Sequence, residues 1–164
     1  MPPDFEGVIS ATVSALLLVQ VIVMTADEFV FHRTRGLGRF ERVGHVVDTG
    51  VYFFAVIIPA LFLPTKTALT IFAIIAVISS LVITKDEPVH ARECGGKEQW
   101  CHAVLFILHG VLLISIGALW YAAPQSVLLK ILPVLVFSWG FYQFYYWNIY
   151  YVTSTKTGRT AHHQ

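Results

Sequence analysis

The chain has 164 residues, of which 56% are hydrophobic and 13% are charged, and its formal net charge is +1. Soluble domains carry about 25% charged residues, so this composition argues against a soluble globular protein. A net charge this close to zero gives no sign of a nucleic-acid partner, and we expect none. We instead expect an all-α polytopic membrane protein that forms a single integral membrane domain over residues 1–164.

Five apolar runs follow one another along the chain, over residues 7–31, 40–63, 67–84, 98–121 and 125–151. An α-helix needs about 20 apolar residues to cross a bilayer, and the runs are close to this length. Runs this long and continuous are typical of membrane helices and not of the short alternating strands of a barrel. The sequence therefore predicts five transmembrane helices joined by short polar or proline-containing turns.

Basic residues gather between runs one and two, between runs three and four, and in a polar tail over residues 152–164. The connections at the opposite ends of the helices contain little beyond Lys66. Because positively charged loops stay on the cytoplasmic side, we expect the N-terminus outside and the C-terminus in the cytoplasm. The membrane is expected to be a bacterial inner membrane.

The same order of polar residues occurs twice in the chain. Each copy has an acidic pair, then a histidine, and then a glutamate and a histidine four residues apart. The first copy is Asp27-Glu28, His32, Glu41 and His45, and the second is Asp86-Glu87, His90, Glu98 and His102. This internal repeat predicts two parallel hairpins, 7–63 and 67–121, related by a pseudo-twofold axis along the membrane normal. The hairpins would form a four-helix transmembrane bundle, with the fifth helix (125–151) packed outside it.

Residues four apart share one face of an α-helix, so each Glu–His pair is expected to point in one direction. Pro88 is expected to bend or end the third helix and to present His90 from a broken turn. The candidate metal ligands are Glu28, His32, Glu41, His45, Asp48, Glu87, His90, Glu98 and His102. The residues expected to support these ligands from behind are Asp27, Tyr52, Asp86 and His109.

His109 lies two helical turns deeper than His102, and Tyr52 is its counterpart in the first copy of the repeat. Polar side chains inside membrane helices are candidates for function. The alternative for His109 is a buried histidine that bonds to Tyr52 or to a backbone carbonyl. Cys94 and Cys101 flank the same polar segment, and a ligand role for either thiol stays open beside the role of a free thiol.

The ligand pattern resembles that of the ferritin-like dimetal carboxylate proteins, in which Glu-x-x-His motifs and single glutamates point into a four-helix bundle. The resemblance covers roughly residues 27–102 and concerns the chemistry of the ligands. This chain is richer in histidine, uses four-residue spacing at three of four places, and lies in a membrane. The resemblance implies two divalent metal ions. Mixed carboxylate and imidazole ligands suit iron, which we expect, with zinc or manganese as alternatives.

These features lead to several functional hypotheses. The first is an oxidoreductase with a di-iron centre at the cytoplasmic edge of the membrane, acting on a membrane lipid or a quinone-like molecule. The aromatic run near the end of the fifth helix would face this substrate, although such runs are also typical of membrane interfaces. The alternatives are a zinc-stabilised binding protein and a metal transporter. A haem is not expected, because carboxylates one turn from each histidine would have no role beside a haem. The simplest alternative is that the acids only pair with loop arginines.

Overall fold

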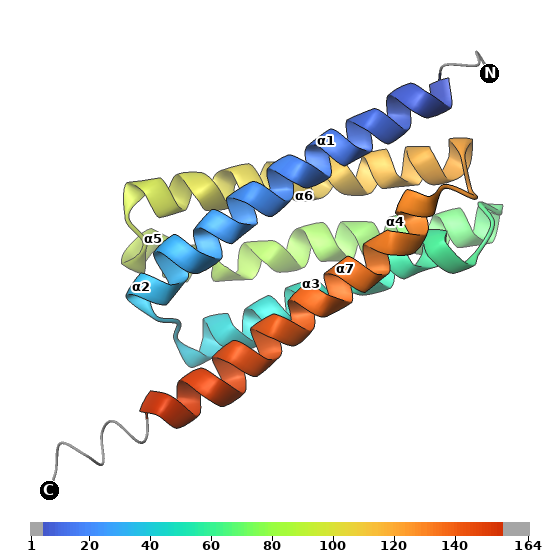
Figure 1. The fold of residues 1–164 in the computed structure, drawn as a ribbon. Coiled ribbons are helices and arrows are strands. Elements are labelled where there is room, and N and C mark those ends of the chain that lie inside the picture. Colours follow the sequence, from blue (N-terminus) through green and yellow to red (C-terminus); the bar gives the residue numbers. More distant parts are fainter. Residues whose placement is uncertain (1–4, 156–164) are drawn as a thin grey trace, which may run out of the picture.

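The computed structural model describes residues 5–155, and the described chain is all-helical (Figure 1). Two π-helices, η1 and η3, and one 3₁₀-helix, η2, interrupt the α-helices. In chain order the elements are α1 (Phe5–Ala26), η1 (Asp27–His32), α2 (Arg33–Arg35), α3 (Arg39–Leu61), α4 (Lys66–Val82), η2 (Ile83–Asp86), α5 (Glu87–Glu93), α6 (Gly96–Ala122), α7 (Val127–Gln143) and η3 (Phe144–Tyr150).

These elements join into five rods that are long and apolar enough to cross a membrane, as the sequence predicted. The rods are Phe5–Arg35, Arg39–Leu61, Lys66–Glu93, Gly96–Ala122 and Val127–Thr155. Large apolar side chains cover their outer surfaces, and Leu18 is 62% exposed and Ile114 is 74% exposed. So much exposed apolar surface is unusual for a soluble monomer, whereas a surrounding lipid phase would cover it.

The third rod differs from the sequence-based boundaries. It continues to Glu93 and does not end near residue 84, because η2 and α5 extend α4. Pro88 lies in the first turn of α5. That position needs no backbone N–H donor, so Pro88 is compatible with the start of α5. The α-helix is interrupted just before it by the 3₁₀-helix η2, and His90 lies in α5 after this interruption.

Helices from the first half of the chain pack against helices from the second half. α1 lies along α6, and α7 lies along α3, which also packs against α4 (Figure 1). The polar segments α2 and α5 lie at one end of the molecule, beside the first turns of α3 and α6. The pseudo-twofold relation between two hairpins stays a prediction.

The apolar core lies away from this polar end. It is formed by α1, α3, α4, α6 and α7, and Trp120 and Phe72 are its largest side chains. The Trp120 ring meets Phe72 edge-on with centroids 5.8 Å apart, and its indole N–H donates to the Phe62 carbonyl at 2.8 Å. Burying this apolar surface stabilises the packing and leaves the polar end as a separate region.

Candidate metal centre

Acidic and imidazole side chains are buried together at the polar end. Asp27, Glu28, His32, Glu98 and Glu41 are each at most 5% exposed. Asp86 and His90 are also buried, and they come from η2 and α5. Buried ionisable groups are costly unless they are paired or bind a metal. Three groups of these side chains have ligand atoms that lie within 4.8 Å of one another.

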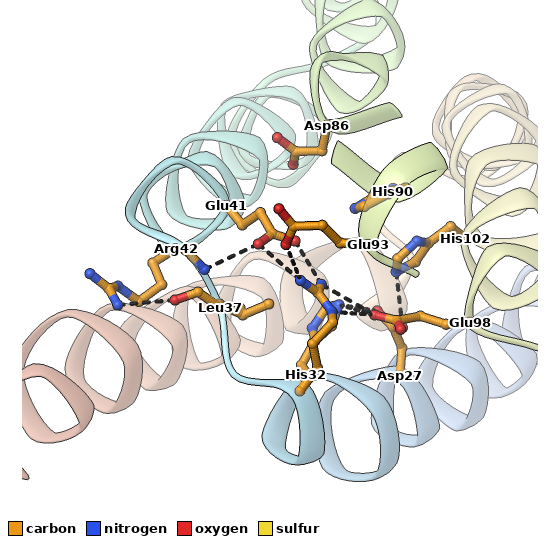
Figure 2. Close-up of polar contacts among 12 residues, drawn as sticks. Asp27, His32, Leu37, Glu41, Arg42, Asp86, His90, Glu93, Glu98 and His102 are labelled. Atoms are coloured by element: carbon orange, nitrogen blue, oxygen red, sulfur yellow. Dashed lines mark hydrogen bonds and ion pairs between the residues drawn. The ribbon is translucent and has the colours of Figure 1, made fainter. Parts of the chain in front are cut away.

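The first group consists of Asp27, His32, Glu98 and His102, all buried. Asp27 Oδ2 lies 3.2 Å from His32 Nε2, and Asp27 Oδ1 lies 3.0 Å from His102 Nε2. Glu98 Oε1 lies 3.9 Å from His32 Nε2. Figure 2 shows the four side chains pointing toward one another from η1 and from the first turns of α6. Two carboxylates and two imidazoles thus converge on one point.

The π-helix η1 explains how Asp27, as well as its neighbour Glu28, comes close to His32. A π-helix has i→i+5 hydrogen bonds, so residues five apart lie on one face. Asp27 and His32 are the first and last residues of η1 and are five apart. The sequence-based assignment used α-helical spacing, which pairs His32 with Glu28 and leaves Asp27 in a supporting position.

The second group consists of His45 and Asp48 on α3 and Asp86 at the end of η2. The Lys85 ammonium lies between the two carboxylates, 2.5 Å from Asp48 Oδ2 and 3.0 Å from Asp86 Oδ2. The absence of a side chain at Gly44 makes room for it, because a Cβ there would lie 2.8 Å from Lys85 Cε. A cation therefore already stands at this pair of acids.

The two groups adjoin. The His32 and His45 ring centroids are 4.9 Å apart, and those of His32 and His102 are 5.6 Å apart. Metal ions in dinuclear sites are about 3.5–4 Å apart. Side chains from both copies of the sequence repeat thus meet at this end of the bundle.

A third group combines His90, Cys94 and His102. The His90 and His102 rings lie 3.8 Å apart, and Cys94 and Cys101 are both free thiols. Burial, followed by the Glu98 carboxylate, raises the pKa of the Cys94 thiol to about 12. His102 thus belongs to both the first and the third group.

Hydrogen bonding leaves many of these atoms unsatisfied. Among residues 5–155, buried atoms without a hydrogen-bond partner include Asp27 Oδ1, His32 Nε2, His45 Nε2, Asp48 Oδ1, Asp86 Oδ1, and both ring nitrogens of His90 and His102. Some are close to another polar atom, but without hydrogen-bond geometry. Natively buried polar atoms nearly always have a partner. Buried carboxylate and imidazole atoms that lie close together without hydrogen-bond partners are an arrangement that a metal ion satisfies.

Glu41 has a different set of contacts. Its two carboxylate oxygens accept hydrogen bonds from the Arg35 guanidinium at 2.6 and 3.1 Å, and Oε2 also accepts from the Gly38 backbone N–H at 3.1 Å. Arg35 also pairs with Glu98 at 3.2 Å and with Glu93 at 3.3 Å. Glu41 therefore caps α3 and pairs with arginine, the alternative role that the sequence left open for these acids. It belongs to none of the three groups found within the described residues.

Glu28 and Glu87 also lie outside the converging groups found in the described part of the chain. Glu28 Oε1 accepts from the Tyr142 hydroxyl at 2.7 Å and from the Trp147 indole N–H at 2.8 Å. Glu87 is 61% exposed at the rim, although one oxygen lies 3.9 Å from His90 Nδ1. Tyr142 and Trp147 were not identified as contacts of the site from sequence. The aromatic run of the fifth helix was their only signal.

His109 and Tyr52 lie deeper in the bundle, with ring centroids 4.8 Å apart. His109 Nε2 is 2.9 Å from the buried Ser79 hydroxyl. His109 thus has a hydrogen-bond partner, but it is Ser79 on α4 and not Tyr52 or a backbone carbonyl. A cavity of about 150 Å³ extends from the histidines to His109 and is also lined by Gln20 and Trp139.

No protein-family model, curated protein or solved structure matches the chain.

Proposed function

We propose that this protein is an integral membrane protein with a dinuclear metal centre at the polar end of its helix bundle. The observation that supports this is the convergence of buried, unpaired carboxylate and imidazole atoms from η1, α3, η2, α5 and α6. Hydrogen bonds within the described chain do not satisfy these atoms, whereas two metal ions would.

The first metal ion takes Asp27, His32, Glu98 and His102 as ligands, and the second takes the group on α3 and η2 described above. His90 lies beside His102 and is available to either metal ion. The carboxylates of the two groups outnumber the cations Arg35 and Lys85, and Arg35 also pairs with Glu41 and Glu93. Two divalent ions compensate this excess of negative charge in surroundings where unpaired charge is costly.

Iron is the metal we propose, because mixed carboxylate and imidazole ligands suit it, with zinc and manganese as alternatives. An iron pair supplies electron transfer or oxygen chemistry, which makes the protein an oxidoreductase that acts on a lipid-soluble molecule. The side chains around the metals have their own tasks. Arg35 orients Glu98 through a hydrogen bond at 3.3 Å, and Tyr142 and Trp147 hold Glu28, whose second oxygen lies 3.8 Å from His32.

Elemental analysis of protein purified without added metal, together with its optical spectrum, tests this proposal. We expect two metal ions per chain in the wild type. The variant Glu98→Gln should lose more than half of this metal, because Glu98 is a buried member of the first group. Glu93→Gln is the matched control, since Glu93 also contacts Arg35 but its side chain is 58% exposed. Equal, full metal content in both variants would refute the ligand assignment.

A second function is favoured by the number of elements that the ligands join. The groups connect η1, α3, η2, α5 and α6, so bound zinc would fasten the bundle without any turnover. In that case metal removal should lower the unfolding temperature, and the bound metal should show no redox change under dithionite or air. Iron that changes its optical spectrum between the two treatments would favour the oxidoreductase.

A further inference from the structure

The cavity continues past the histidines into the apolar part of the bundle. Gln20 and Met24 from α1, Phe106 and His109 from α6, and Trp139 from α7 line this inner part. Phe106 is 45% exposed on the outer surface of α6. Since the same side chain lines the cavity and faces outward, the cavity reaches the surface of the bundle at a position where lipid would lie.

Two polar atoms in this inner part lack a partner within residues 5–155. They are the carbonyl oxygen Oε1 of Gln20, an acceptor, and the indole nitrogen Nε1 of Trp139, a donor. Nearby, Gln143 uses its carbonyl oxygen to accept from Thr49 at 2.7 Å. One donor and one acceptor are thus left unsatisfied, and burying either without a partner is costly.

A hydroxyl group matches this pair of atoms, because it donates one hydrogen bond and accepts others. Its O–H would donate to Gln20, and its oxygen would accept from Trp139. The whole cavity, from the histidines of the metal groups to His109, has a volume of about 150 Å³, and the inner part is a share of it. Met24, Leu105 and Phe106 supply an apolar lining against which a ring packs.

We propose that this inner cavity binds the ring hydroxyl of an amphipathic phenol or quinol, whose apolar tail leaves past Phe106 into the membrane. The proposal rests on the proposed function, since it gives the substrate class for the same site. The ring would lie between His109 and the histidines of the metal groups, which line the same cavity. Such a position brings a lipid-soluble reductant to the metal pair without exposing the metals to water.

The test is saturable binding of radiolabelled para-decylphenol to protein in lipid nanodiscs, corrected for partitioning into empty nanodiscs. Decylbenzene, which lacks only the hydroxyl, is the matched ligand. We expect the wild type to bind the phenol about tenfold more tightly than decylbenzene, the effect of one well-formed buried hydrogen bond or more. Equal affinity for the two ligands would overturn the proposal and indicate that water satisfies Gln20 and Trp139.

Variants separate the hydroxyl contact from a general effect on packing. Trp139→Phe keeps an aromatic ring but removes the donor, and Gln20→Met keeps the length but removes the acceptor. Each should weaken binding of the phenol about tenfold and leave binding of decylbenzene unchanged. Trp100→Phe is the control, because Trp100 is 73% exposed on α6. Unchanged phenol affinity in both cavity variants would also overturn the proposal.

Metal content is measured in the same samples and distinguishes the two proposals. Trp139→Phe and Gln20→Met should retain the metal of the wild type, because neither residue belongs to a ligand group. A hydroxyl preference in protein that holds no metal would reject the dinuclear centre and keep the phenol site. Full metal content without a preference for the hydroxyl would reject the phenol site and keep the dinuclear centre.

Discussion

Two cationic side chains stand among the acids of the polar end, and they differ in chemistry. Arg35 contacts three carboxylates, and Lys85 contacts two. The Arg35 guanidinium is a planar set of donors that matches carboxylate geometry, so it forms a fixed part of the site. The Lys85 ammonium is a compact charge on a flexible stem, which lets it withdraw when a divalent ion takes its place.

Replacing Lys85 tests whether its ammonium stands where a metal ion binds. In Lys85→Met, Asp48 and Asp86 lose their cation, and metal-free protein should be destabilised by about 3 kcal/mol. The metal no longer has to displace an ammonium, so the affinity for the second metal ion should rise about tenfold or more. Thermal unfolding with and without chelator and titration with cobalt(II) measure the two effects.

The control for this experiment is Lys97→Met, which removes an exposed lysine of the same polar segment. It should change neither the metal affinity nor the unfolding temperature. A Lys85→Met protein that is destabilised and is not rescued by any divalent metal would show that Asp48 and Asp86 only form an ion pair.

At the scale of elements, irregular helical turns decide which acidic residue faces the centre. The π-helix η1 directs Asp27 toward His32, and the 3₁₀-helix η2 places Asp86 inside while Glu87 stays exposed. Such irregular turns are frequent at functional sites. In each copy of the sequence repeat, the first acid of the pair therefore belongs to a converging group, and the second does not.

The register of η1 leads to a prediction for two neighbouring residues. Asp27→Asn should lose more than half of the bound metal, because it removes a charged ligand of the first group. Glu28→Gln should keep the metal, since the glutamine carbonyl still accepts from Tyr142 and Trp147. Elemental analysis of the two purified variants measures this difference. Metal loss in Glu28→Gln alone would mean that the segment has ordinary α-helical spacing when metal is bound.

A glycine closes the segment that carries Arg35. Gly36 has a φ of 76°, and a Cβ there would lie 2.5 Å from the Tyr151 hydroxyl oxygen. Gly36→Ala should therefore destabilise the protein by at least about 1–2 kcal/mol, the cost of a left-handed conformation alone. Gly95→Ala is a matched control, because that site has no atom within 4 Å of the added Cβ and no left-handed φ. Thermal unfolding in detergent compares the two, and similar melting temperatures would contradict this view of Gly36.

Across the whole molecule, charge and apolar packing are separated along the helix axes. The largest apolar core lies toward the end of α6, around Trp120, and the candidate metal groups lie at the opposite end of that helix. The outer surface between them is apolar, as shown by Ile107 and Ile114, which are 63% and 74% exposed. A bilayer around the middle of the bundle would cover this surface and leave the polar end at one interface.

The positive charge at the polar end predicts its side of the membrane. In a variant without native cysteines, Lys97→Cys should resist an impermeant maleimide added to intact cells, and Gln125→Cys should react. Both side chains are exposed, and they lie at opposite ends of the bundle. Labelling after membrane disruption controls for access. Reaction of the Lys97→Cys protein in intact cells would reverse the predicted orientation.

Much of the architecture could be predicted because it depends on local composition. The lengths of the apolar runs predicted five helices able to cross a membrane, and the structure confirms them and the all-α fold. The expectation of buried His, Asp and Glu groups that could hold metal is also confirmed. This chain has few polar residues. Those at the helix ends therefore had few other positions at which to cluster.

The choice between neighbouring acids depended on tertiary structure. Asp27 and Glu28 are both carboxylates, and the sequence alone does not show that a π-helix begins at Asp27 and brings it close to His32, five positions further on. Tyr142 and Trp147, more than 100 residues away, donate to one oxygen of Glu28, and its other oxygen lies 3.8 Å from His32. Contacts between distant segments thus decide the partners of Glu28, the Arg35–Glu98 pair and the cavity. The sequence by itself determined the residue types and the helices that carry them, because hydrophobicity and helix length are local properties.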